Sequence, residues 1–333
     1  MSSSGSNGTS DKRPMVGGQA VLEGVMMRSP WRLAVAVRNP KGEIITRSAP
    51  FKSITKRVKV LGFPVIRGAV GLFEAMKMGM GALSWSAEIA EGENEKKKSK
   101  AAAFWEMLLT IVLSVVLAVG LFMLVPYAAA EASPIDNNPF LFHLIAGGLR
   151  IALLIGYMLA ISLIPDITRV FQYHGAEHKS IFTWEKLLTL EVSNAAQMSR
   201  FHPRCGTSFL LLAAVMTMIG FALFDAVWVT FIGDFRNIFT RLLIHLPVIP
   251  IVAGLSYEVL RLVEKHAEDK LWQPLVKPGF WLQKITTREP DEGQLEVALH
   301  SLRESLIQGD EVYEGPAREE AVPDSAQAEP VVI

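Results

Sequence analysis

The sequence is poor in the features that assign a chain to several common classes of protein. Among its 333 residues there is one cysteine, Cys205, so an internal disulfide is excluded and a reducing environment is favoured. Net charge is also missing, because 33 basic residues balance 33 acidic ones, and no overall positive field indicates a nucleic acid partner. Residues 1–14 are rich in Ser and Gly and lack the apolar centre of a secretory signal, so we expect a disordered tail there.

Apolar residues, in contrast, are abundant. They make up 50% of the chain, and the mean hydropathy of +0.29 is high for a soluble protein. Asp225 and His245 lie within apolar runs, where we expect them to face the protein interior in a hydrogen-bonded packing role. We predict a mainly α, polytopic membrane protein, because four runs reach the roughly 20 residues that a helix needs to cross a bilayer: 104–130, 140–164, 208–232 and 239–263.

The remaining segments divide the chain into smaller units. Two β-rich stretches, 33–38 and 43–47, flank the turn Asn39–Gly42 and predict a hairpin. The glycines around Glu23 lack the spacing of a phosphate-binding loop, so tight turns are the favoured reason for them. The full division is a disordered tail (1–14), a small β-hairpin-containing cytosolic unit (15–63), an amphipathic helix at the membrane interface with a buried soluble helix as the alternative (64–90), a charged linker (91–103), a four-helix membrane domain with a cytosolic loop at 166–207 (104–285), a C-terminal amphipathic helix (286–308) and a disordered acidic tail (309–333).

The distribution of basic residues predicts the orientation of the spans. Lys96, Lys97 and Lys98 precede the first span, whereas the turn after it, 131–138, has no basic residue. Basic residues return in the loop between the second and third spans and again after the fourth span, with Arg236 and Arg241 as the discordant pair. By the positive-inside rule, both termini and the central loop face the cytoplasm.

The central loop contains the pattern His-x-x-Glu-His at His174–His178, the inverted form of a zinc protease motif. On a helix His174 and His178 share a face, so both rings could reach one divalent metal ion, most simply zinc, with Glu177 beside them as a general base. Zinc with three protein ligands keeps a position for water, whose pKa it lowers towards about 7. A polar helix whose histidines only form hydrogen bonds is the alternative.

Further candidates follow in the sequence. His202 and Cys205 lie just before the third span, and imidazole and thiolate are both good zinc ligands. Glu258, near the cytosolic end of the fourth span, could add a carboxylate ligand or hold a histidine ring, with a salt bridge to Arg261 as the alternative. Arg204 could neutralise an anionic group of a substrate, or be an ordinary basic residue at the inner leaflet.

Several motifs together resemble one known family. GGQAVLEGVMMRSP near the start, YHGAEHK and FHPRCGTSFL in the middle, and LWQP with ITTREPDEGQLEVAL near the end are similar to the YqhQ-like family of bacterial membrane proteins, in the same order, from about Val16 to Leu306. That family is a domain of unknown function with a predicted metal-dependent enzyme label. The resemblance implies a multi-pass protein of the bacterial inner membrane, whose matching polar positions are His174, Glu177, His178, His202, Arg204 and Cys205.

These patterns lead to one main functional hypothesis. We expect a metal-dependent hydrolytic site at the cytoplasmic membrane surface, with His174, His178 and either His202 or Cys205 as ligands and Glu177 activating water. A membrane peptide or a lipid-linked compound would be the substrate. The alternative is a non-catalytic membrane scaffold or assembly factor, in which the same residues form a structural metal site or a hydrogen-bond network. A transporter is less favoured, because the spans contain few polar groups and no inverted repeat is visible.

Overall fold

The computed structural model describes residues 13–92, 100–133, 138–266, 269–308 and 311–312. Three predicted segments therefore lie wholly or largely outside the described residues: the N-terminal tail up to residue 12, the centre of the charged linker at 93–99, and the acidic tail apart from its residues 311 and 312. The described part is mainly helical with a small antiparallel sheet near the N-terminus, as the sequence predicted.

The sheet is a four-stranded meander in which each strand pairs with the next along the chain. Its strands are β1 (Gly17–Val21), β2 (Gly24–Arg28), β3 (Arg32–Arg38) and β4 (Ile44–Pro50). The predicted hairpin is confirmed as β3 and β4, with Val35 opposite Arg47. The glycine-rich stretch before it forms a second hairpin, whose two-residue turn holds Glu23 at a positive φ of 51°.

Helices cover both faces of this sheet. One face packs on α2 (Ile66–Glu91), where Ala82 and Trp85 contact a cluster of buried strand residues. The other face packs on α6 (Pro165–Glu185) and α12 (Glu292–Ser305), and a larger hydrophobic core lies between them. Buried side chains alternate between the two faces because successive residues of a strand point in opposite directions.

Helix α12 is the amphipathic helix that the leucine spacing predicted. A capping box starts it: the Asp291 side chain accepts from the backbone of Gln294, and the Gln294 side chain bonds back to the backbone of Asp291. Its leucines Leu295, Leu299 and Leu302 are at most 2% exposed, because they face the sheet and α6. The apolar stripe therefore packs inside the sheet unit, where the sheet provides the apolar partner that the stripe requires.

Helix α2 links the sheet to the helical bundle. Its last turns lie on the sheet, while its first turn crosses α10 (Ile249–Lys265) at two glycines, Gly68 and Gly254, where a Cβ would meet the backbone of the other segment. The opposite face of α2 exposes Phe73 and Met76. The predicted helix at 64–90 is thus present. One face is buried in the protein, and the other exposes apolar side chains.

Within the described residues, four helical segments are long and apolar enough to cross a membrane, as predicted: 104–131, 140–161, 206–231 and 238–263. The first combines α3 (Lys100–Val119), a π turn (Gly120–Leu124) and α4 (Val125–Glu131); the second is α5 (Pro139–Ile161) and the third α8 (Gly206–Phe231). The fourth is α9 (Ile238–His245), a 3₁₀ turn (Leu246–Val248) and α10. Pro247 lies at this break, where it has no backbone N–H for a helical hydrogen bond.

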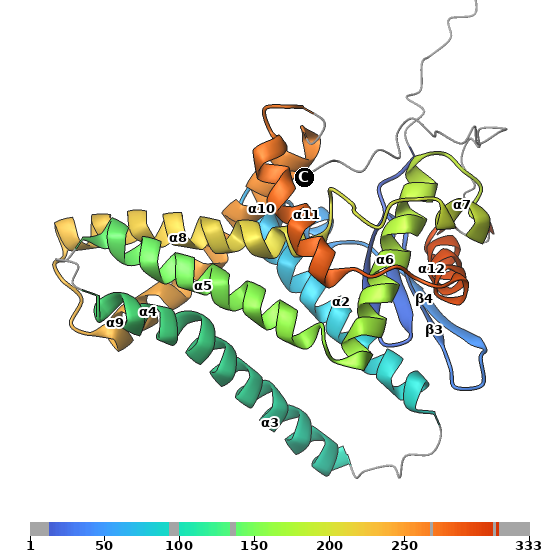
Figure 1. The fold of residues 1–333 in the computed structure, drawn as a ribbon, viewed down its shortest axis with the longest axis horizontal. Coiled ribbons are helices and arrows are strands. Elements are labelled where there is room, and N and C mark those ends of the chain that lie inside the picture. Colours follow the sequence, from blue (N-terminus) through green and yellow to red (C-terminus); the bar gives the residue numbers. More distant parts are fainter. Residues whose placement is uncertain (1–12, 93–99, 134–137, 267–268, 309–310, 313–333) are drawn as a thin grey trace, which may run out of the picture.

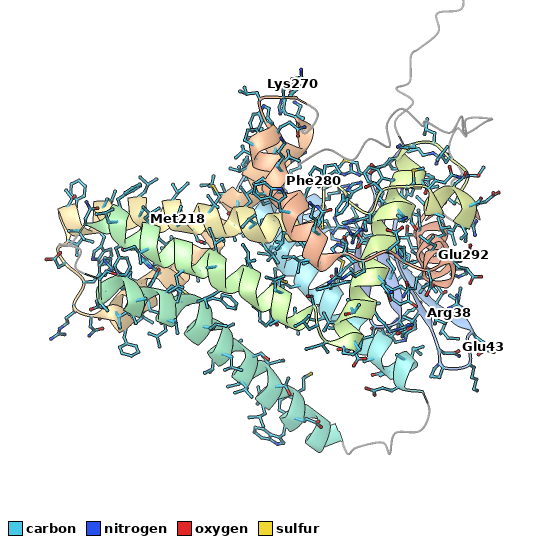
Figure 2. The ribbon with its side chains drawn as sticks, in the orientation of Figure 1. Arg38, Glu43, Met218, Lys270, Phe280 and Glu292 are labelled. Carbon is cyan, nitrogen blue, oxygen red and sulfur yellow. The ribbon has the colours of Figure 1, made fainter. Side chains whose placement is uncertain are left out.

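Short elements complete the fold: α1 (Ile54–Arg57), a 3₁₀ turn (Lys59–Gly62), α7 (Val192–Ala196), α11 (Gln273–Thr286), and the two-residue strands β5 (Ile307–Gln308) and β6 (Glu311–Val312). Figure 1 shows α6, α7, α12 and the sheet together at one end of the molecule, with α3, α4, α5, α8 and α9 extending away from them. In Figure 2, Arg38 and Glu292 lie in this sheet unit and Met218 lies in the helical part. Three segments far apart in sequence thus form one unit at one end of the bundle.

Candidate metal centre

Helix α6 carries the His-x-x-Glu-His pattern on a buried face. Pro165 stands at its first position and Asp166 in its first turn, both favourable at a helix start. Gly175 lies inside the helix where it costs about 1 kcal/mol relative to alanine. Glycine is needed at this position because a Cβ at Gly175 would collide with the carbonyl oxygen of Arg288, in the segment after α11.

Two backbone carbonyls orient the imidazole rings of this face. Nδ1 of His174 lies 2.8 Å from the carbonyl oxygen of Thr286, and Nδ1 of His178 lies 2.5 Å from that of Arg200. A carbonyl oxygen only accepts hydrogen bonds, so each Nδ1 must be the protonated nitrogen. Each neutral ring therefore has an unprotonated Nε2 with a free electron pair, the form in which imidazole binds a metal.

The thiol of Cys205 meets both rings. Its Sγ is 3.2 Å from Nε2 of His174 and hydrogen-bonds to His178. One ligand atom from each of these three residues lies within 4.8 Å of the others. Cys205 is the N-cap of α8, and its sulfur accepts from the backbone N–H of Thr207 at 3.4 Å. Burial raises the pKa of the Cys205 thiol, but the neighbouring His178 and the hydrogen bonds of Thr207 together lower it by more, which favours the thiolate.

Glu177 lies beside this group in a nearly dry environment. Its side chain is 6% exposed, and burial raises the pKa of the carboxyl to about 7 although nearby His174 opposes the shift. The backbone of Gly18 in β1 hydrogen-bonds to the carboxyl, and a Cβ at Gly18 would lie 2.8 Å from Cγ of Glu177. Gly18 at the start of β1 thus forms a wall of the site.

Together His174, His178 and Cys205 could hold one divalent metal ion. Two imidazole nitrogens and a thiolate are ligands typical of zinc, and rings held by Nδ1–H bonds to carbonyl groups are typical of metal-binding histidines. Three protein ligands leave a position for water or substrate in a tetrahedral site. The carboxyl of Glu177, with a pKa near neutrality, can take up or release a proton beside that position.

The structure leaves two predicted ligands outside the group. Nδ1 of His202 is 3.2 Å from the backbone N–H of Arg204, and Nε2 is 3.2 Å from a carboxylate oxygen of Glu185. Both ring nitrogens of His202 therefore have partners, and its ring supports the turn before α8. Of the two alternatives for the second element, Cys205 is the residue that joins the two histidines.

Glu258 lies at the crossing of α2 and α10. Its carboxylate accepts a hydrogen bond from Nε of Arg67 at 2.7 Å, so the hydrogen-bonded ion pair is with Arg67 in place of the expected Arg261. Arg204, proposed to bind a substrate anion, forms an ion pair with Glu185. Neither Glu258 nor Arg204 belongs to the group of ligand atoms.

Sequence reasoning gave no role to several residues that build the site. The side chain of Gln283 bonds to both the N–H and the carbonyl of His202, each at 2.8 Å, and fixes the turn before Cys205. Buried Lys179 donates to the backbone of Ala196 and forms an ion pair with Glu289. The segment 285–290 belongs to one of the family-like motifs, but only the fold shows that it packs against α6.

A second cluster of ionisable residues lies in the helical bundle. His143 of α5 and His245 of α9 each contact one carboxylate oxygen of Asp225 in α8, at 2.7 and 2.6 Å. All three residues are at most 1% exposed. Tyr127 lies 2.7 Å from Nδ1 of His245, and Arg241 forms an ion pair with Asp225 at 3.1 Å. The expectation that Asp225 and His245 face the interior is confirmed, with His143 as an added partner.

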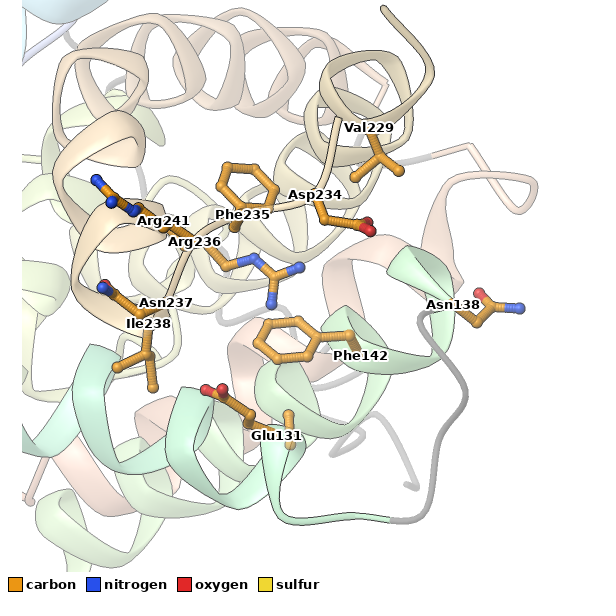
Figure 3. A pocket seen from close by; sticks show the side chains of 11 residues that line it. Glu131, Asn138, Phe142, Val229, Asp234, Phe235, Arg236, Asn237, Ile238 and Arg241 are labelled. Carbon is orange, nitrogen blue, oxygen red and sulfur yellow. The ribbon is translucent and has the colours of Figure 1, made fainter. Parts of the chain in front are cut away.

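Arg241 also lines a cavity of about 230 Å³ at the end of the bundle far from the sheet (Figure 3). Figure 3 shows Phe142, Phe235 and Arg236 around the cavity. The guanidinium of Arg241 lies 3.8 Å from the ring centroid of Phe142 and 4.7 Å from that of Phe235. Arg241 therefore connects the lining of the cavity to buried Asp225.

Comparisons with known proteins agree with the resemblance noted in the sequence. A family model described as "Protein of unknown function (DUF1385)" matches residues 63–308. The "Uncharacterized protein YqhQ" of Bacillus subtilis (strain 168) is 36% identical over 305 residues, which cover 88% of this chain and 92% of that protein. No solved structure matches. Neither description contains a metal or a reaction.

Proposed function

The chain belongs to the DUF1385 family, whose description gives no activity, and from the geometry of its buried His-Cys group we propose that it is a membrane-bound, metal-dependent hydrolase. The proposed ligands are His174, His178 and Cys205, and the proposed metal is zinc. The proposed general base is Glu177.

One observation carries this proposal: both histidines donate Nδ1–H to a carbonyl, which leaves the free electron pair on Nε2, and both rings lie within metal-sharing distance of the same thiol. A thiol has one proton and can donate it to only one of the two rings. Packing and hydrogen bonding alone therefore do not explain why two free electron pairs lie beside one sulfur atom. The same alignment is what a shared metal ion requires.

The residues around the group provide the means for hydrolysis. A bound zinc ion would supply Lewis acid chemistry and increase the acidity of water. Glu177, buried with a pKa of about 7, would accept the proton of the attacking water and return it to the leaving group. Burial of His178 and Cys205 at 2% and 3% exposure would strengthen the electrostatic interactions at the reacting bond.

The same end of the molecule is proposed to face the cytoplasm of a bacterial cell, at its inner membrane. The N-terminal strands, the loop with α6 and the C-terminal α12 all belong to the sheet unit, which supports placing both termini and the loop on one side. The excess of basic residues next to these segments favours the cytoplasmic side. A membrane peptide or a lipid-linked compound is the proposed substrate, because the site lies next to the apolar helices.

Elemental analysis of the purified full-length protein tests the ligand set. We expect about one zinc ion per chain in the wild type, and loss of most of it in His174→Ala and Cys205→Ser. Glu177→Gln should keep the metal, and His300→Ala, which removes a histidine from outside the group, is the matched control. Wild-type protein purified without chelators that contains no metal, or metal content unchanged in the two ligand variants, would contradict the proposed centre.

The Glu177→Gln variant also separates the hydrolase from the scaffold hypothesis. If it retains metal and fold but no longer complements a strain that lacks the protein, a catalytic role for the carboxyl is supported. Full complementation by this variant would contradict the proposed general base and would favour a structural metal site.

A further inference from the structure

A cavity of about 310 Å³ opens on the sheet unit, between the N-terminal strands and the segment that leads to α2. Three positively charged side chains line it, and among the described residues none that lines it is acidic. The lining residues are Met15, Val16, Gly17, Arg28, Ser29, Pro30, Phe51, Ser53, Lys56 and Arg204. Three cations around a cavity of this size favour an anionic ligand.

The three cations come from separate elements that the fold brings together. Arg28 ends β2, and its guanidinium lies 5.1 Å from the ring centroid of Phe51, which limits its motion. Lys56 lies on α1. Arg204 belongs to the turn before α8 and forms an ion pair with Glu185, so it contributes less free charge than the other two. Planar guanidinium groups and a flexible ammonium are the usual partners of phosphate.

The cavity adjoins the proposed metal centre at two points. Gly17 in its lining precedes Gly18, whose backbone bonds to Glu177. Arg204 in its lining precedes Cys205. A ligand held by the cations would therefore lie beside the wall that separates the cavity from the metal-binding group.

The segment next to the cavity suits the surface of an anionic membrane. Residues 52–63 carry large apolar side chains that are 41–61% exposed, at Ile54, Val58, Val60 and Phe63. The basic residues Lys56, Arg57 and Lys59 lie between them, and Lys52 comes just before them. Exposed apolar and basic side chains in one short segment are typical of chains that lie in the lipid headgroup region.

We propose that this cavity binds the phosphate group of an anionic amphiphile, presented from the membrane beside residues 52–63. The three cations and the neighbouring segment support the binding site itself. Its role in holding a substrate rests on the proposed hydrolase function. Arg28 and Lys56 contact the phosphate, and the apolar part of the amphiphile remains in the bilayer next to α2.

Calorimetric titration of the full-length protein in a non-ionic detergent tests the site. The probes are dioctanoyl phosphatidic acid, dioctanoyl phosphatidylcholine and inorganic phosphate. We expect phosphatidic acid to bind more tightly than either other probe, and the Arg28→Gln/Lys56→Gln variant to weaken it at least about tenfold. A matched variant, Lys41→Gln/Arg47→Gln, removes two exposed positive charges from the β3–β4 hairpin and should bind as the wild type does.

Each result decides the proposal. Equal binding of inorganic phosphate and phosphatidic acid, both weakened in Arg28→Gln/Lys56→Gln, would keep the phosphate site and overturn the lipid source. Equal affinity of the two double variants, or no binding of any phosphate probe, would overturn the site. Zinc content is measured on the same samples: its absence from the wild type contradicts the proposed hydrolase, whereas the binding result stands independently.

Discussion

The two histidine clusters use similar residues in opposite ways. In the sheet unit, His174 and His178 donate Nδ1–H to backbone carbonyls, which leaves Nε2 with the free electron pair beside Cys205. In the bundle, His143 and His245 turn Nε2 towards a carboxylate. A carboxylate accepts, so in the bundle these nitrogens are N–H donors. One cluster therefore offers electron pairs and the other offers protons.

This difference assigns different roles to the clusters. In the bundle, the Asp225 carboxylate accepts from two rings and pairs with Arg241, so every charge has a partner and a metal cation would compete with a guanidinium. In the sheet unit, the three candidate ligands are two imidazoles and one thiol, and their free electron pairs suit a metal cation. The direction of the ring nitrogens distinguishes a packing network from a candidate metal centre better than the residue types do.

The largest effect is expected from Asp225→Asn in the bundle. The amide has one acceptor and one donor group, so one of the two histidine N–H groups and the charge of Arg241 lose their partner in a buried site. We expect a loss of about 3–5 kcal/mol in the free energy of unfolding, with zinc content unchanged. Asp234→Asn, at an exposed position on the cavity rim, is the control, with a change within about 0.5 kcal/mol. Loss of zinc in Asp225→Asn would show that the bundle cluster holds the metal.

Zinc should stabilise the protein through the sheet unit alone. A ligand that binds only the folded state, at 100 times its dissociation constant, adds about 2.7 kcal/mol to the free energy of unfolding. We expect this increase in the wild type and in His143→Gln, and none in Cys205→Ser. Each variant is compared with and without added zinc by denaturation in detergent, so the destabilisation that a substitution itself causes cancels. Stabilisation of Cys205→Ser to the wild-type extent would contradict the difference between the clusters.

The sequence predicted much of this arrangement and missed the parts that depend on distant contacts. Four spans follow from run length and the β3–β4 hairpin from residue type, both local properties. Helical spacing placed His174 beside His178. The carbonyls of Thr286 and Arg200, which select the nitrogen that each ring presents, come from other segments and carry no sequence signal. The glycines in the sequence likewise do not show which distant segment packs against each of them.

The pH dependence of stability should differ between Glu177→Gln and the wild type when metal is removed. The folded-state pKa of Glu177 is about 7, above the ordinary value of 4.5, because burial disfavours the charged form. Below pH 4.5 the carboxyl is neutral in both states and does not change the free energy of unfolding. Between pH 4.5 and 7 it lowers that free energy increasingly, and above pH 7 the loss stays constant. At pH 8 we expect Glu177→Gln to be more stable than the wild type by about 3 kcal/mol, and at pH 4 to be equal.

The measurement is denaturation in detergent at both pH values after treatment with a chelator. Glu296→Gln is the control, because its side chain is 59% exposed and its substitution removes the same formal charge. A difference between Glu177→Gln and the wild type that is equal at pH 4 and pH 8 would show that the carboxyl is not the neutral, buried group described here. Addition of zinc should reduce the difference, because a nearby cation favours the carboxylate.

The smallest effect concerns the glycine pair at the start of β1, which connects the sheet to the metal-binding group. A Cβ at Gly18 would lie 2.8–2.9 Å from the carboxyl side chain of Glu177, whereas a Cβ at Gly17 would meet nothing within 4 Å. We expect Gly18→Ala to displace the carboxyl and to lower the free energy of unfolding by about 1–2 kcal/mol, with zinc retained and complementation reduced. Gly17→Ala should behave as the wild type in all three measurements. Full complementation by Gly18→Ala would mean that the position of Glu177 does not matter for function, and the carboxyl would then be as passive as Asp225 in the bundle.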